Sequence, residues 1–187
     1  MIDRYQAIAT IMAHIGSDDL VLSTTGMISR EVFMTHDRPG NFYMIGSMGL
    51  LSALGLGLAL LIPEQRVVIL EGDGSALMSL GTLPLIATAC PANLVHIILD
   101  NEAYESTGAQ PSISTQVDLA QVGQSCGYKR AIRVDDHEGL PNALQACMTD
   151  PGPSLLLIKA AIAPVGVLRA CRTHRPPSGT GFTRPFV

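Results

Sequence analysis

Two short polar motifs follow apolar segments of this chain, and both carry side chains that bind metal ions. The first is GDGS at residues 72–75, which comes after the apolar run VVIL and a glutamate. The second is DN at residues 100–101, which follows LVHIIL. A carboxylate beside a phosphate site needs a cation, and proteins hold Mg²⁺ with one or two carboxylates together with substrate phosphates. The pattern predicts a Mg²⁺ site, with Asp73 and Asn101 as ligands, that holds a phosphorylated molecule.

Each motif taken alone also fits a simpler structural role. Asp73 can cap a helix, and the stretch DNEAY can form a turn. A phosphate-binding P-loop needs a lysine after its glycines, which is absent here. A dinucleotide fingerprint needs a third glycine near position 77, which is Leu77. Asn101 stands 28 positions after Asp73 (101 minus 73), which leaves room for one helix and one strand between them. Together the two motifs favour the metal site.

The elements that must position these residues alternate between strand and helix patterns. The patterns predict a single α/β domain with a mostly parallel sheet and helices on both faces, because apolar strands separated by helices are buried on both sides. Such sheets bind ligands at the carboxyl ends of their strands. The predicted strands are 20–22, 42–45, 66–70, 94–99, 131–134 and 154–158. The predicted helices are 3–14, a helix opened by STTGMISREVF, a glycine-rich helix after residue 45, and the segments 75–89, 116–126 and 136–148. The segment 75–89 is expected to break near Gly81 and Pro84, and Asp136 is the expected N-cap of the last helix.

Residues 43–63 carry no charge, which raises the question of a membrane span. Neither end of the segment carries the cluster of basic or aromatic residues that anchors a membrane span. Its glycines, Gly46, Gly49, Gly55 and Gly57, would let a buried helix pack close to a sheet. We therefore expect a core helix and no membrane association.

Composition limits the remaining possibilities. The chain has 187 residues, 47% of them hydrophobic, which predicts one domain over residues 1–164 and an irregular tail over 165–187 that is rich in Arg, Pro, Gly and Thr. The net charge of −4 and only two lysines argue against a nucleic-acid-binding surface. The four cysteines lack metal-site spacing, and no leader pattern opens the chain, so we expect a cytoplasmic protein.

At the level of whole motifs, GDG followed by a spacer and an asparagine after an apolar strand resembles the signature of thiamine diphosphate enzymes. The segments LSTTGMISREVF, FYMIGSMGLLSALGLGLAL and DNEAYESTGAQPS extend the likeness over about residues 20 to 160. In these blocks the chain resembles the C-terminal, diphosphate-binding half of the sulfopyruvate and phosphonopyruvate decarboxylases, and it is most similar to the separate β subunit of the split sulfopyruvate enzyme. The resemblance implies the diphosphate-binding domain of the thiamine diphosphate-binding fold.

Carried over by position, the resemblance implies a set of site residues. Asp73 and Asn101 would ligate Mg²⁺ by side chain and Ala103 by its carbonyl. The Gly46 carbonyl would bind the aminopyrimidine ring, and Met48 would force the cofactor into a bent shape, although a methionine is more commonly part of a core. The remaining cofactor contacts would come from Thr25, Gly26, Ser47, Gly72, Gly74, Ser75, Tyr104 and Glu105. The second anionic group of the substrate would bind to the hydroxyls of Ser106 and Thr107 or to a basic side chain near the first loop, namely Arg30, His36 or Arg38. Arg30 can equally be a solvated surface charge.

The implied activity is the thiamine diphosphate- and Mg²⁺-dependent decarboxylation of 3-sulfopyruvate or phosphonopyruvate, with release of CO₂ and formation of an aldehyde. In the resembled family a glutamate of a second, pyrimidine-binding domain activates the cofactor. This chain has room for one domain, so the glutamate is expected from a separate pyrimidine-binding α subunit in an α₂β₂ assembly. Four alternatives stay open: an acetolactate synthase-like carboligase, the β chain of a 2-oxo acid oxidoreductase, a non-catalytic assembly module, and a homo-oligomer that uses its own carboxylate.

Overall fold

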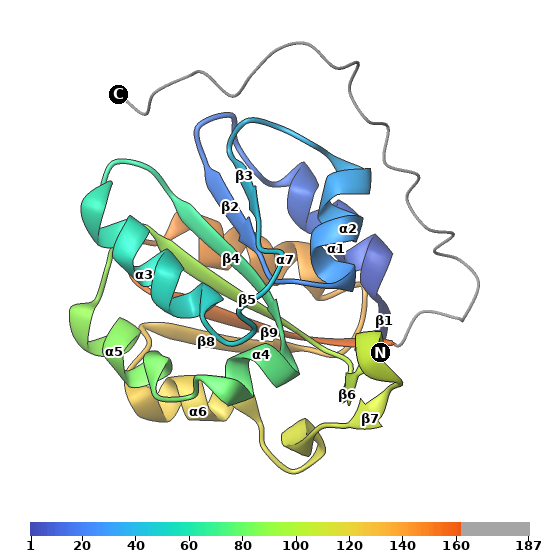
Figure 1. The fold of residues 1–187 in the computed structure, drawn as a ribbon. Coiled ribbons are helices and arrows are strands. Elements are labelled where there is room, and N and C mark those ends of the chain that lie inside the picture. The colour runs from blue at the N-terminus through green and yellow to red at the C-terminus, as the bar shows by residue number, and fades with distance from the viewer. Residues whose placement is uncertain (162–187) are drawn as a thin grey trace.

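A computed structural model describes residues 1–161 of the chain. The tail predicted for residues 165–187 lies outside the described residues, as do the last three residues of the predicted domain. Figure 1 shows a twisted central sheet with helices packed on both of its faces. This arrangement confirms the α/β fold class predicted from the alternation of strands and helices.

The sheet is parallel, and its centre is formed by three strands: β4 (Val67–Gly72), β5 (Leu94–Asp100) and β9 (Ser154–Ala161). β4 pairs with β5 with Gly72 opposite Leu99, and β5 pairs with β9 with Asp100 opposite Lys159. On the outer side of β4 lie β2 (Leu20–Ser23) and then β3 (Asn41–Tyr43). The outer edge of β9 pairs with β8 (Arg130–Val134) and, further along, with the short β1 (Ile2–Asp3). The GDGS and DN motifs therefore lie at the carboxyl ends of adjacent strands.

Helices cover the sheet in two layers, each with its own hydrophobic core. One face carries α1 (Arg4–Ala13), α2 (Met27–Thr35) and α7 (Leu140–Thr149), whose core residues include Ile8, Val32 and Leu144. The other face carries α3 (Leu51–Leu61), α4 (Asp73–Met78), α5 (Thr82–Ala89) and α6 (Leu119–Cys126). Strands β4, β5 and β9 contribute to both cores, because their alternate side chains point to opposite faces.

A short excursion follows β5 and was not predicted. It consists of the hairpin of β6 (Ala103–Tyr104) and β7 (Gln110–Pro111) with the 3₁₀ turn η1 (Glu105–Thr107) between them. A second 3₁₀ turn, η2 (Ile113–Thr115), leads into α6. Elements of two or three residues carry too little periodicity to be recognised in a sequence.

Three sequence predictions need correction. The helix predicted to begin at Asp136 begins at Leu140, and the Asp136 carboxylate instead accepts a hydrogen bond from the Gly139 amide within the preceding turn. The break predicted within residues 75–89 lies at Gly81, which separates α4 from α5 as expected, but Pro84 lies within α5 and does not interrupt it. The helix predicted over residues 116–126 begins at Leu119, because the side chain of Asp118 caps it by accepting from the amides of residues 120 and 121.

The prediction of a glycine-rich core helix that packs closely on the sheet is right for one face of the helix only. Gly46 and Gly49 precede α3, and of the two glycines within it only Gly55 packs tightly, against Ile69 of β4, whereas Gly57 faces open space. One side of α3 is buried, but the other is exposed, with Leu61 80% exposed. Across residues 1–161, no helix combines the length and the apolar character that a bilayer crossing requires.

Candidate functional site

A cleft lies at the carboxyl edge of the sheet, where β2, β4 and β5 end. Its floor is formed by the turn from β4 into α4 at residues 72–75, and its walls by the turn from β2 into α2 and by residues 101–107 after β5. Most residues predicted for the site line this cleft: Thr25, Met48, Gly72, Asp73, Gly74, Ser75, Asn101, Ala103, Tyr104, Glu105, Ser106 and Thr107. Segments far apart in the sequence thus meet at one place.

Asp73 is buried in the floor of the cleft as the first residue of α4. Its Oδ2 atom accepts hydrogen bonds from the hydroxyls of Ser112 and Ser114, the second at 3.0 Å. Burial raises the pKa of Asp73 above its ordinary value and the nearby Asp100 carboxylate raises it further, although the two serines and the Gly74 amide oppose this. Burial and Asp100 outweigh these donors, so the environment disfavours the ionised carboxylate. Both hydroxyls bind Oδ2, and Oδ1 accepts no side-chain hydrogen bond from residues 1–161.

Asp100, the last residue of β5, lies behind Asp73 and has its own counterion. The Ser114 hydroxyl is 2.7 Å from Asp100 Oδ1, and the Lys159 ammonium donates to Asp100 Oδ2 at 2.8 Å and to Glu102 Oε1 at 2.5 Å. Burial alone lowers the pKa of Lys159, but these carboxylates outweigh burial and raise it. One of the chain's two lysines therefore neutralises Asp100, whereas Asp73 has no cation beside it among the described side chains.

Asn101 faces the cleft with a fixed orientation. Its Nδ2 atom donates to Glu105 Oε2 at 3.0 Å, and its Oδ1 atom accepts from the Ala103 amide at 3.2 Å. A carboxylate accepts and a backbone N–H donates, so these partners determine which end of the amide is oxygen. A carboxamide oxygen and a carboxylate are therefore held at the ends of neighbouring strands, as a Mg²⁺ site requires.

A buried polar chain beneath the cleft supports the segment at residues 46–49. The Ser75 hydroxyl donates to Glu71 Oε2 at 2.7 Å and accepts from the Gly49 amide at 3.2 Å. Glu71 Oε1 in turn contacts Nε2 of the fully buried His96 at 2.6 Å. The proton of Ser75 is thus directed to Glu71, and its oxygen anchors the turn that presents Met48. The predicted contact of Ser75 with diphosphate oxygens stays a prediction.

The turn that carries Met48 has unusual backbone geometry. Ser47 has φ 55° and Gly49 has φ 92°, both in the left-handed region, which is costly for a serine. Such strain persists only where the surroundings hold it, and it collects at functional sites. Met48 is 39% exposed and lines the cleft, so its side chain is not part of the hydrophobic core.

The site agrees with what comparison with known proteins shows. Residues 24–158 match the family described as thiamine pyrophosphate enzyme, C-terminal TPP binding domain. The match covers well over half of the chain and includes both motifs. The chain belongs to this family. Thiamine pyrophosphate is the compound called thiamine diphosphate here, so the domain is a thiamine diphosphate-binding domain.

Several curated relatives of this thiamine diphosphate-binding domain are decarboxylases by name. A phosphonopyruvate decarboxylase of Streptomyces viridochromogenes is 38% identical over 95% of this chain and 48% of its own length. A sulfopyruvate decarboxylase subunit beta of Methanococcus maripaludis is 41% identical over 84% of this chain and 83% of its own. The chain thus spans about half of the first relative and most of the second.

Solved structures share the fold at lower sequence identity. The thiamine diphosphate-dependent 4-hydroxybenzoylformate decarboxylase of Rhodococcus jostii RHA1 superposes with a TM-score of 0.74 and 20% identity. That match covers 86% of this chain and 33% of the larger enzyme. At this identity the likeness shows the fold of the thiamine diphosphate-binding domain and nothing about substrate.

Not every predicted site residue of the thiamine diphosphate-binding domain reaches the cleft. Gly26 is the N-cap of α2 with φ 95° and lies beside Ser106, but it does not line the cleft, and neither do Gly46 and Ser47. Arg30 is exposed on α2 and likewise does not line the cleft.

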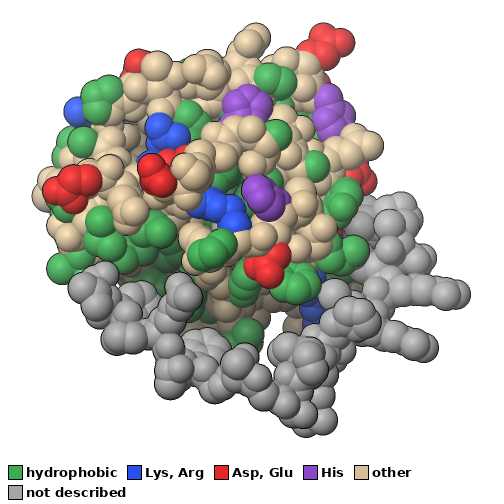
Figure 2. Space-filling model, turned by 90° about the horizontal axis from the view of Figure 1, so that it is seen from above, with side chains coloured by type: hydrophobic (Ala, Val, Ile, Leu, Met, Phe, Trp, Pro, Cys, Tyr) green, Lys and Arg blue, Asp and Glu red, His purple; other side chains and the backbone are tan. Residues whose placement is uncertain are grey.

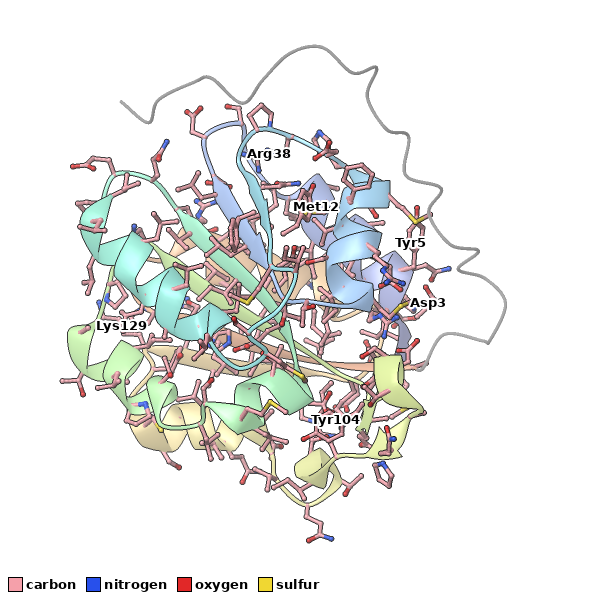
Figure 3. All side chains as sticks on the ribbon, in the orientation of Figure 1. Asp3, Tyr5, Met12, Arg38, Tyr104 and Lys129 are labelled. Atoms are coloured by element: carbon pink, nitrogen blue, oxygen red, sulfur yellow. The ribbon has the colours of Figure 1, made fainter. Side chains whose placement is uncertain are left out.

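Two further cations of the first loop lie away from the cleft. His36 follows the far end of α2, and Arg38 donates to backbone oxygens of Ser17 and Asp19 at the amino end of β2. Figure 3 places Arg38 and the cleft residue Tyr104 at opposite edges of the sheet. The suggestion that Arg38 or His36 binds a substrate anion here is therefore wrong. Figure 2 looks onto the edge that carries Arg38, where charges of both signs are interspersed and no single-sign patch dominates.

Sequence reasoning missed several residues of the site. Ser112, Ser114 and Lys159 support the carboxylates of the floor, and Arg4 lines the cleft from the start of α1. Lys159 carried a usable signal, because a lysine within an apolar strand needs an acidic partner. Arg4 carried none, because it opens an amphipathic helix about one hundred residues from its partner at position 105.

Tyr104 closes the cleft over the second glycine of the GDGS motif. A side chain at Gly74 would overlap the ring of Tyr104, so the position requires glycine for steric reasons. The φ angle of Gly74 is not in the left-handed region, so close packing, and not backbone freedom, explains this glycine.

Proposed function

We propose that the chain is the diphosphate-binding subunit of a thiamine diphosphate- and Mg²⁺-dependent decarboxylase that converts 3-sulfopyruvate or phosphonopyruvate to CO₂ and an aldehyde. The observation that carries the proposal is the pairing of Asp73 with the oriented Asn101 at the ends of β4 and β5. The names of the relatives support the reaction and the substrate class.

The chemistry of the donor set fits Mg²⁺. Asp73 is a buried carboxylate whose ionised form is disfavoured, and a dication beside it removes that penalty. Within residues 1–161 no group of three or more His, Cys, Asp or Glu side chains is placed to hold a metal. A hard cation here would depend on Asp73, the Asn101 and Ala103 carbonyls, phosphate oxygens and water, which is the ligand set that Mg²⁺ accepts.

When bound, thiamine diphosphate supplies a carbon nucleophile and accepts the electron pair left by departing CO₂. The chain's own residues would bind, orient and exclude water. Asp73 and Asn101 would hold the cation, Met48 would present an apolar surface to the cofactor, and Tyr104 would close the cleft over the diphosphate end. In such reactions the protein contributes mainly by stabilising the charge that develops in the transition state, with preorganised dipoles in a site from which water is excluded.

Substrate class is tested by turnover. The chain assembled with a partner chain is expected to release CO₂ from 3-sulfopyruvate or phosphonopyruvate with a kcat/KM at least about 100-fold above that for pyruvate, because a site built for a second anion is left unsatisfied without it. Coupled measurement of CO₂ and aldehyde tests this. A preference for pyruvate, or formation of acetolactate in place of aldehyde, would identify another thiamine diphosphate enzyme.

Met48 provides a second test. Met48→Ala is expected to lower kcat by about 10- to 100-fold and to change the Kd of thiamine diphosphate by no more than about 3-fold, because the side chain positions reacting groups. Steady-state kinetics and calorimetric titration separate these quantities. Met34→Ala is the matched control, since Met34 is a half-exposed methionine on α2 that does not line the cleft. Normal kcat in Met48→Ala would remove its proposed role.

An exposed apolar surface supports the proposed α subunit partner. The outward side of α3 carries leucines at 44 to 80% exposure, namely Leu54, Leu60 and Leu61, and no charged residue. Beside its start, Leu50 is 57% exposed and Ile45 is 97% exposed. This surface adjoins the cleft through Met48, so a subunit covering it would also lie against the cofactor. Exposed apolar patches of this kind mark interaction sites, and relatives named subunit beta support a separate α chain. We propose an α₂β₂ assembly because oligomers favour closed symmetry.

A further inference from the structure

Arg4 is a buried cation that the family match does not include. It is 3% exposed at the start of α1, lines the cleft, and precedes the matched range, which begins at residue 24. Its Nε and one terminal nitrogen donate to the two carboxylate oxygens of Glu31 at 2.8 and 2.7 Å. The guanidinium also donates to both oxygens of Glu105, one of them at 3.3 Å.

Arg4 therefore holds the carboxylates of Glu31 and Glu105 together with a permanent positive charge. Burial disfavours its charge, but the hydrogen bonds to Glu31 and Glu105 outweigh burial and raise the pKa of Arg4 further. The guanidinium therefore stays protonated at every pH at which the protein folds. Arginine suits this role because its planar fork binds two carboxylates at once with fixed geometry, which an ammonium group cannot do.

Arg4 is linked to Asn101 through the carboxylate of Glu105, which accepts hydrogen bonds from both side chains. The Glu105 Oε2 atom that accepts from Arg4 also accepts from Asn101 Nδ2 at 3.0 Å. If Glu105 turned away, the Asn101 amide nitrogen would lose its acceptor, and the carboxamide could rotate. Outer hydrogen-bond partners of this kind set the orientation of metal ligands.

We propose that Arg4 is a positioning residue for the metal site: it fixes Glu105, and Glu105 fixes Asn101 so that the carbonyl oxygen is presented to the cation. The inference rests on the proposed function, because it assigns Arg4 a role toward the Mg²⁺ that this function requires. It also makes the first turn of α1 part of the site, although that turn is distant in sequence from the GDGS and DN motifs.

The first test measures how much Mg²⁺ is needed for cofactor binding. In Arg4→Met, the Mg²⁺ concentration that gives half-maximal thiamine diphosphate binding is expected to rise about 10- to 100-fold, as for the loss of other partners of metal ligands. Arg4→Lys is expected to give a smaller rise, since it keeps the charge but not the fork. Calorimetric titration of the full chain at a series of MgCl₂ concentrations measures both.

Loss of Arg4 leaves Glu31 buried without a cation, so folding must be controlled for. Arg4→Met combined with Glu31→Gln removes that buried charge and is expected to fold while keeping the increased Mg²⁺ requirement. Ile11→Ala truncates a fully buried residue of the same helix and is expected to lower the melting temperature with an unchanged Mg²⁺ requirement.

A second readout needs no cofactor. The side-chain amide resonances of Asn101, assigned by their loss in Asn101→Ala, are expected to shift in the ¹⁵N spectrum of Arg4→Met and to stay unchanged in Ile11→Ala. If the Mg²⁺ requirement and the Asn101 resonances are unchanged in Arg4→Met and in Arg4→Met combined with Glu31→Gln, the role of Arg4 is overturned and the proposed function is not affected. Failure of the wild-type chain to bind thiamine diphosphate with Mg²⁺ would instead overturn the proposed function.

Discussion

Asp73→Asn is expected to lose thiamine diphosphate binding while the cofactor-free protein becomes no less stable. The variant removes a metal ligand, so the Kd of thiamine diphosphate in the presence of Mg²⁺ should rise by on the order of 100-fold or more. The raised pKa of Asp73 means that the folded protein disfavours its charge, so the neutral side chain should fold at least as well. Calorimetric titration and thermal melting measure the two effects.

The difference in stability between Asp73→Asn and wild type should depend on pH. The pKa of Asp73 is higher in the folded state than in the unfolded state, so wild type loses stability as pH rises from the ordinary value towards the raised one. The advantage of Asp73→Asn should be absent at low pH, grow through that interval, and stay constant above it. Asp118→Asn is the matched control. Burial raises the pKa of Asp118, but the amides that it caps and Arg133 outweigh burial and lower the pKa, so the variant should be slightly less stable above the ordinary pKa and should bind the cofactor unchanged. A lower melting temperature for Asp73→Asn at neutral pH would contradict the disfavoured charge.

The chain alone is expected not to activate the cofactor. With thiamine diphosphate and Mg²⁺ saturating, the cofactor C2 proton should exchange with solvent at about the rate of free cofactor, and a pyrimidine-binding partner chain should accelerate exchange by roughly 10²- to 10⁴-fold, the usual contribution of a positioned acid or base. Deuterium exchange followed by NMR measures this rate.

We expect no activation by the chain alone because the carboxylates at and beneath the cleft already hydrogen-bond to other side chains of the chain. Glu31 and Glu105 bind Arg4, Glu71 binds His96 and Ser75, and Asp73 accepts two hydroxyls. The control is the same pair of chains with EDTA, in which acceleration should disappear. Fast exchange by the chain alone would show that the base is one of its own groups and would favour the self-sufficient homo-oligomer.

The parallel order of the strands could be predicted from the sequence because it follows from local patterns. LVHIIL and VVIL are too apolar to face water on either side, so the sheet had to be covered on both faces. From that, the polar residues directly after β4 and β5 had to reach one edge, and the structure brings Asp73, Asn101 and Ala103 to one cleft. Their roles as metal ligands stay predictions.

The supporting residues could not be predicted, since they depend on long-range packing. Arg4 meets Glu105, Ser114 meets Asp73, and His96 meets Glu71 only once the sheet is formed. The exposure of α3 has a related cause. Its leucines and glycines read as core because the sequence shows how apolar a helix is but not whether its outer face is covered by the same chain.

The pairing of β1 with β9 sets the order in which this molecule can be completed during synthesis. Ile2 lies opposite Ala160, a separation of 158 residues (160 minus 2), so β1 has no place in the sheet until β9 has left the ribosome. β9 also joins β8 to β5, so a nascent chain that lacks it can pair only β3, β2, β4 and β5 and leaves β8 and β1 without a partner strand. Arg4 directly follows β1, and its arrival in the cleft therefore coincides with closure of the sheet. A chain that has not reached this point exposes unpaired strand edges and has a cleft without Arg4.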